Sequence, residues 1–201
     1  MKKKQIYKIL IPCMVVVLVS CYVVNRCADI YNMTRCKYEY KSITDLTLAG
    51  IDFRGITGIS SLNPLALAKL YASFSSPSGK LPLSFTLNLN VSNPASGDAS
   101  LSRFDYIIAI DGIEMTRGAL EQSIYIPAGG QSLLSFNIAF DLKQSLSGKS
   151  LDVIKNLALN FIGIGDKPSN VTFSLKPGVN VSGKTVISPN YIPISFTLNK
   201  K

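Results

Sequence analysis

The sequence predicts a mainly β protein: an antiparallel β-sandwich of the immunoglobulin or fibronectin type III kind with two short helices. Two stretches, 83–91 and 134–142, alternate strictly between large apolar and smaller, mostly polar residues. A period of two places the large side chains on one face, as in a strand that lies between a core and water. Shorter segments of this kind, separated by Gly, Pro, Asn or Asp, recur over most of the chain, as expected for a sandwich.

The expected strands follow from this alternation and from the turn residues between them. Asp111-Gly112 is the strongest hairpin signal, because this dipeptide suits a two-residue type I′ turn. Pro94 ends the strand before it, because proline has no N–H for a ladder. The strands are expected at 37–53, 81–93, 101–111, 113–117, 120–126, 134–142, 171–175, 179–181 and 192–198.

Two helices interrupt the series of strands. Asn63 is a suitable N-cap with Pro64 at the first helical position, and apolar residues continue to Phe74. Ser150 is expected to cap a second helix that has apolar residues at helical spacing as far as Phe161. Gly163 and Gly165 follow that residue and are expected to end the helix.

The polar face of the strand at 83–91, from Ser84 to Ser92, carries no charged residue. We therefore expect this face to be lightly solvated or covered by another element. The helix at 63–74 is the nearest candidate in the sequence, and it would form a lid over a groove in the sandwich.

The N-terminus has the pattern of a secretory signal: four lysines within the first eight residues, then the apolar run Ile9–Val19. Leu18-Val19-Ser20-Cys21 resembles the lipobox of bacterial lipoproteins. The resemblance implies cleavage between Ser20 and Cys21 and a lipid on Cys21. The alternative is an uncleaved anchor over Ile9–Val24, although 16 residues fall short of the ~20 that a membrane-spanning helix needs.

The expected organisation is a signal peptide at 1–20, a lipidated tether or short helix at 21–42, and the sandwich at 43–201. A lipid anchor places the protein on a membrane of the cell envelope. Tyr22 is not the Asp associated with inner-membrane retention, which favours the outer membrane. Cys27 and Cys36 remain after cleavage; they either form a disulfide in this oxidising compartment, or Cys27 is a small apolar residue of a helix.

The composition argues against catalysis, metal binding and nucleic-acid binding. The chain has no His, which removes the commonest general base and metal ligand. No Ser or Cys stands in a nucleophilic motif, Asp111 is better explained as a turn residue, and no cofactor motif is complete. The net charge of +9 includes the four N-terminal lysines, and the other basic residues are scattered. We expect no enzyme activity, no cofactor, no metal and no nucleic-acid partner.

The segment Leu83–Pro94, which ends in Asn-Pro, precedes a hairpin with Phe104-Asp105-Tyr106 and Asp111-Gly112, and then Ile126-Pro127-Ala128-Gly129. This succession resembles the LEA type 2 or water-stress-and-hypersensitivity (WHy) domain. The helix at 63–74, the segment Phe161–Asp166 and the lipobox resemble the lipoprotein branch of that family in Gram-negative bacteria. The resemblance covers 43–198; it implies a fibronectin-like sandwich without catalytic residues.

Two functions fit these observations. The first is a membrane-anchored, non-enzymatic module of the cell envelope that is structural or binds a partner protein of unknown identity. The alternative is a carrier of an apolar ligand, such as a lipid, in a groove that the apolar helix at 62–74 would cover.

Overall fold

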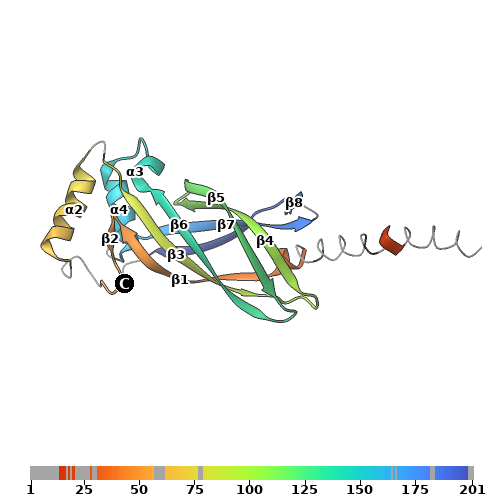
Figure 1. Ribbon diagram of the computed structural model, residues 1–201. Helices are drawn as coiled ribbons and strands as arrows, with labels where there is room; N and C mark the ends of the chain where they lie inside the picture. Colours follow the sequence, from red (N-terminus) through yellow and green to blue (C-terminus); the bar gives the residue numbers. More distant parts are fainter. Residues whose placement is uncertain are drawn as a thin grey trace, which may run out of the picture.

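The structure is a computed structural model, and it describes residues 14–16, 18, 20, 28, 31–56, 62–76, 79–163, 165, 167–181 and 184–198. Over these residues the chain forms two packed antiparallel sheets, which confirms the predicted β-sandwich (Figure 1). One sheet has the order β2-β1-β3-β6, formed by Ile51–Asp52, Lys37–Leu48, Pro82–Ser92 and Gln131–Asp141. The other has the order β5-β4-β7, formed by Ile113–Ile126, Ala99–Ile110 and Ser169–Val181.

The free side of β7 pairs with two strands in succession. β9 (Ile192–Leu198) pairs with the first half of β7, and β8 (Lys184–Ile187) pairs with the second half. Pro177 lies between these two pairings, where its carbonyl accepts a hydrogen bond from the Ser188 N–H at 2.8 Å. The backbone N and O of a strand residue point toward the same neighbouring strand. The position where Pro177 lacks an N–H therefore lies in the gap between β9 and β8, where no ladder hydrogen bond needs it. The predicted strands at 171–175 and 179–181 are therefore one continuous strand.

The core lies between the two sheets and is built from the alternating positions predicted from sequence. All five large residues of β3, from Leu83 to Val91, are buried. Three phenylalanines from three strands meet in the middle, with ring centroids of Phe104 and Phe136 4.8 Å apart and those of Phe136 and Phe173 5.1 Å apart. On one open side of the sandwich, Tyr40 of β1 stacks on Phe196 of β9.

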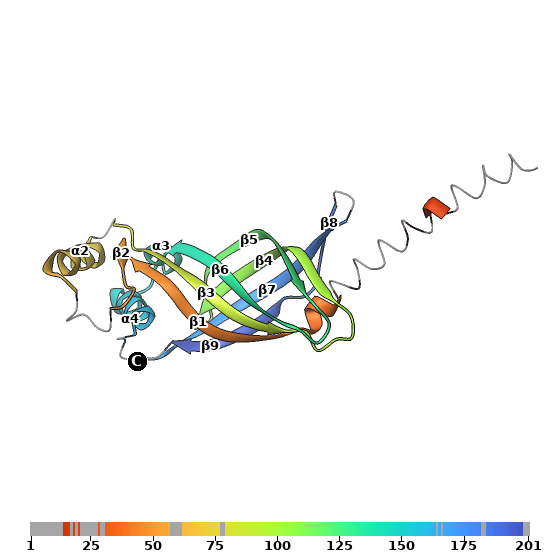
Figure 2. The ribbon, with the colours of Figure 1, turned by 60° about the horizontal axis from the view of Figure 1, so that its bottom comes forward.

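The polar face of β3 forms a ladder of hydrogen bonds across its sheet. Asn88 donates to Ser42 and Thr44 of β1 and accepts from Ser135 of β6, at 3.2, 3.1 and 2.6 Å. Thr86 donates to Asn137 of β6 at 3.0 Å. These contacts satisfy the hydrogen-bonding groups of small uncharged side chains. Most of the face is half-buried, because side chains on the neighbouring strands β1 and β6 cover it. The expectation that the helix at 63–74 covers it is wrong, because that helix lies at the end of the sandwich (Figures 1 and 2).

The hairpin at Asp111-Gly112 is confirmed, with positive φ angles of 49° and 77° as a type I′ turn requires. The return strand β5 differs from the expectation, since it runs without a break through the two segments predicted at 113–117 and 120–126. Gly118 is accommodated in this strand because the Tyr106 side chain, directly opposite on β4, occupies the space above it. A Cβ at position 118 would come within 2.7 Å of the Tyr106 hydroxyl oxygen.

Both predicted helices are present with the predicted caps. In α2 (Pro64–Ser75) the Asn63 side chain accepts from the Ala66 N–H at 2.8 Å, and in α4 (Leu151–Phe161) Ser150 accepts from the Val153 N–H at 3.5 Å. A short helix that was not predicted, α3 (Leu142–Ser145), follows β6. Asp141 caps it by accepting from the N–H groups of its second and third residues.

The sandwich has two unlike ends. Helices α2, α3 and α4 and the C-terminal end of β9 lie at one end, which we call the helical end (Figures 1 and 2). The other end, which we call the basal end, carries the helical residues 31–35, the turn between β5 and β6, and β8. β1 begins at Lys37, directly after residues 31–35 and within the segment expected to be a tether.

Candidate binding site

The predicted lipid site, Cys21, lies outside the described residues, as does Cys27. Cys36 is buried at the basal end, where its sulfur lies 3.5 Å from the carbonyl oxygen of Asn32. Burial raises the pKa of this thiol to about 11. Lipidation and the Cys27–Cys36 disulfide stay predictions. Within the described residues, no helix has the length and hydropathy to cross a membrane.

Three acidic residues of the β4–β5 hairpin are each explained by local structure. Asp111 is a turn residue, and its carboxylate accepts from the Asn170 N–H at 2.8 Å. Glu114 accepts two hydrogen bonds from Arg117, which hold the pKa of that carboxyl below its ordinary value. Asp105 accepts from Arg103 at 3.1 Å. In the described part of the chain no three His, Cys, Asp or Glu side chains gather to hold a metal ion.

The most distinctive recess lies at the helical end, between α4 and the hairpin of β4 and β5. We call it the α4 groove. It has a volume of about 690 Å³, within the ~300–1,000 Å³ range of small-molecule sites. Its apolar wall comes from three separate regions of the chain, namely Ile110, Ile113, Met115, Leu146, Val153, Leu157, Leu159 and Pro168.

Hydrogen bonds between these regions hold the groove in shape. The Ser145 hydroxyl donates to the Met115 carbonyl at 2.6 Å, which joins α3 to β5. The Asn156 side chain donates to the carbonyl of Lys167 and accepts from its N–H, both at 3.3 Å, which joins α4 to the segment before β7. These hydrogen bonds to backbone atoms fix α3 and α4 against the sandwich. The groove is therefore formed without an occupant.

The rim of the α4 groove carries charges of both signs. Asp111 and Asp152 lie on it together with Lys155 and Lys167. The first turn of α4 also exposes apolar side chains, with Val153 at 44% and Leu151 at 41%. Of these two, Val153 lines the groove and Leu151 does not. The site is an open apolar groove with a balanced charged rim, rather than an enclosed pocket.

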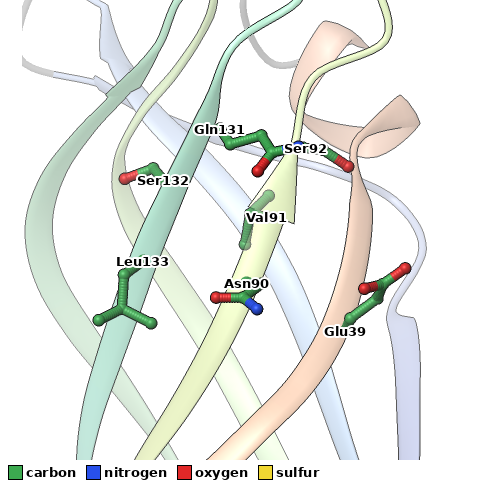
Figure 3. Close-up of a pocket in the computed structure, with 7 residues that line it drawn as sticks. All are labelled: Glu39, Asn90, Val91, Ser92, Gln131, Ser132 and Leu133. Carbon is green, nitrogen blue, oxygen red and sulfur yellow. The ribbon is translucent and has the colours of Figure 1, made fainter.

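A second recess lies on the outer face of the β3 sheet near the basal end (Figure 3). Glu39, Asn90 and Leu133 lie opposite one another in register on β1, β3 and β6. Figure 3 labels these residues together with Val91, Ser92, Gln131 and Ser132, which complete the lining of the recess. Its volume of about 250 Å³ is below the ~300 Å³ lower bound for small-molecule sites. We interpret it as the uneven surface of a sheet.

Sequence reasoning missed the α4 groove, because its wall joins Ile110, Met115, Leu146 and Leu157, which are distant in the chain. One signal was available: Val153 is apolar although it lies outside the helical stripe Ile154, Leu157, Ala158 and Phe161 that faces the core. Single exposed apolar side chains are common on protein surfaces, so Val153 alone did not specify a groove.

No family model matches the chain, and no curated protein matches it. Similar solved structures include a protein from Archaeoglobus fulgidus, with 10% identity over 81% of this chain and 98% of that one and a TM-score of 0.39. A protein described as late embryogenesis abundant (LEA) has 9% identity over 99% and 91%, with a TM-score of 0.40. A protein from Arabidopsis thaliana has 14% identity over 80% of both chains, with a TM-score of 0.36. At these values the resemblance to the LEA type 2 domain stays a prediction from the sequence motifs.

Proposed function

We propose that this protein is a lipid-anchored, non-enzymatic module of the cell envelope, of the LEA type 2 kind, that binds a segment of a partner protein in the α4 groove. The anchor is Cys21, on the outer membrane. The observation that carries the proposal is the α4 groove itself, a preformed apolar surface at the end of the sandwich opposite the expected tether.

The openness and charge of the groove favour a protein segment over a lipid. Small-molecule sites bury most of the ligand surface, whereas an acyl chain in this open groove would remain partly in water. The rim has two carboxylates and two ammonium groups, so it has no net attraction for an anionic lipid head. An amphipathic helix presents an apolar stripe flanked by charges of both signs, which matches this wall and rim.

The groove is tested by crosslinking from two positions on the same helix. A photoreactive phenylalanine analogue placed at Val153 faces the groove, and the same analogue at Leu151 is the control. We expect one discrete protein adduct in cells from position 153 and none from position 151. Val153→Glu should abolish the interaction without unfolding α4, because Glu at this position completes a capping box with Ser150. Equal adducts from both positions would contradict the proposal.

An apolar wall is also compatible with the alternative function, the binding of a lipid. Native mass spectrometry of the full chain extracted from membranes distinguishes the two occupants. A stoichiometric lipid that is lost in Val153→Glu and kept in Leu151→Glu would replace the protein partner in the proposal. A chain that carries only the lipid attached at Cys21 removes this alternative.

The anchor is tested separately by cell fractionation. Cys21→Ala should leave an unprocessed precursor or release the protein from membranes, whereas Cys13→Ala, a control in the expected signal peptide, should behave as the unaltered chain. Membrane attachment and mature mass that are unchanged in Cys21→Ala would exclude the lipobox.

A further inference from the structure

The basal end carries a second apolar and charged surface that the α4 groove does not use. A recess of about 500 Å³ lies between the helical residues 31–35 and the turn from β8 to β9. Tyr31 and Thr34 form one side, and Val186, Ile187, Pro189 and Ile192 are among the residues of the other. Tyr31, Val186 and Tyr191 are exposed around it, at 60%, 42% and 39%. We call this surface the basal patch.

Cations accompany the exposed aromatic rings of the basal patch. The Arg35 guanidinium carbon lies 5.5 Å from the ring centroid of Tyr31, and Lys176 Nζ lies 5.1 Å from that of Tyr191. Segments 31–37 and 176–191 contain Arg35, Lys37, Lys176 and Lys184 and no acidic residue.

Two carboxylates lie close to these cations. Asp98, whose backbone carbonyl accepts from Asn32 at 2.8 Å, keeps its charge although its carboxylate accepts from Tyr125 Oη and the Ala128 N–H. Glu39 is exposed two residues after Lys37. The four basic residues outnumber these two carboxylates, so the patch carries an excess of positive charge.

Tyrosines and basic side chains together are the chemistry of a protein at a membrane surface. Tyrosine places its ring at the head-group level, and Lys and Arg extend their charge to anionic head groups while their stems stay against apolar groups. Each such cation near an anionic membrane adds to binding. An open surface that combines both types is suited to head groups.

The chain also limits how far the basal patch can lie from the anchor. Tyr31 is the tenth residue after Cys21, and a fully extended chain of ten residue steps spans at most about 35 Å. This is less than the length of β5, whose 14 residues extend over roughly 46 Å. With Cys21 in a bilayer, the basal end is held near the membrane.

We propose that the basal patch docks on the surface of the anionic membrane that holds the anchor, which fixes the sandwich with its helical end and the α4 groove directed away from the bilayer. This inference rests on the proposed lipidation of Cys21. Three properties of the patch favour a membrane as its partner. It has an excess of positive charge, it combines tyrosines with basic side chains, and it lies within reach of the anchor.

The absence of tryptophan from the chain allows a direct test. The full chain carrying Val186→Trp is reconstituted in phosphatidylcholine–phosphatidylglycerol vesicles in which the phosphatidylcholine acyl chains are brominated near the head group. The matched control is Leu65→Trp, on the exposed face of α2 at the helical end. We expect the bromolipid to remove most of the Val186→Trp fluorescence and to leave the Leu65→Trp fluorescence unchanged.

Charge reversal separates docking from anchoring. Arg35→Glu with Lys184→Glu, in the Val186→Trp background, should lose the quenching while the protein still sediments with the vesicles. Unquenched Val186→Trp in a chain that sediments would overturn the docking and leave the anchor intact. A chain that does not sediment although Cys21 is present would overturn both the anchor and the docking that rests on it.

Discussion

The middle of the sandwich and the helical end differ in how far they bury aromatic side chains, as Phe136 of β6 and Tyr71 of α2 show. Phe136 is fully buried between Phe104 and Phe173, whereas Tyr71 is 75% exposed and Leu65 on the same helix is 81% exposed. α2 contributes only Leu70 and Phe74 to the buried set. The middle of the sandwich therefore buries its apolar side chains, whereas the helical end leaves some of its apolar side chains exposed to solvent. These exposed side chains add little to the core and present an apolar surface.

The largest effect should come from the middle of the sandwich. Phe136→Ala removes a ring that two others contact and leaves a cavity, and it should lower the free energy of unfolding by about 3–5 kcal/mol. Leu133→Ala is the control, because Leu133 lies on the same strand with half of its side chain exposed, and it should change stability by less than about 0.5 kcal/mol. Urea unfolding measures both. Equal losses would mean that the two faces of β6 are equally packed.

A buried polar contact should have the next largest effect. Asn93, which precedes Pro94 in the segment that resembles the LEA type 2 domain, shares its amide hydrogens among the carbonyls of Gly97, Ile126 and Pro127 at 2.9–3.2 Å. Its carboxamide oxygen accepts from the Ala95 N–H at 3.0 Å. This side chain therefore joins the loop after β3 to the turn after β5.

Asn93→Ala should cost about 2–3 kcal/mol, because buried carbonyl groups lose their donor. Asn90→Ala, at an exposed position near the end of β3, should cost little. Thermal unfolding of both variants measures the difference. A small loss in Asn93→Ala would mean that water replaces the side chain and that the Asn-Pro motif has no structural role here.

Local patterns predicted most of the strands, both helix caps and the hairpin turn. The alternation in β3 and β6, the caps Asn63 and Ser150, and the turn at Asp111-Gly112 each depend on residues that are neighbours in the sequence. Their physical cause acts over a few residues, so one sequence is enough to find them. The continuous strand β5 was predicted as two segments on either side of Gly118, and only the pairing of that glycine with Tyr106 explains it.

The binding surfaces could not be predicted, because they depend on residues brought together by the fold. The α4 groove needs Ile110, Met115 and Leu157 in one place, and the basal patch needs Tyr31 beside Val186. Nothing in the local pattern around these residues specifies such pairings. The lipobox is different in kind, because it is a linear signal that depends on no fold.

The burial of Cys36 should make stability depend on pH in the alkaline range. Its pKa rises from the ordinary 9.0 to about 11 on folding, so the native state holds its proton more tightly than the unfolded state. The stabilisation is complete below pH 9 and is lost as the pH rises toward 11. Burial also raises the pKa of Tyr38 and Tyr40, which act in the same direction at higher pH.

The difference between the unaltered chain and Cys36→Ala isolates the thiol from these tyrosines. With reductant present, urea unfolding at pH 8 and at pH 11 should show a smaller loss for Cys36→Ala. The same loss in both proteins would mean that Cys36 is ionised or exposed in the folded state, and the basal end would then be less closed than the middle of the sandwich.

The smallest effect should appear at the helical end and should stay there. Asn63→Ala removes the N-cap bond to Ala66 and should destabilise α2 by about 1 kcal/mol. Because α2 contributes few buried residues, it should open without the sheets, so its amide hydrogens should exchange roughly fivefold faster while those of β3 and β6 keep their rates. Hydrogen exchange read by mass spectrometry separates the two regions. A uniform increase across helix and sheets would show that α2 unfolds only with the sandwich, and its exposed apolar face would then belong to the same cooperative unit as the phenylalanine core.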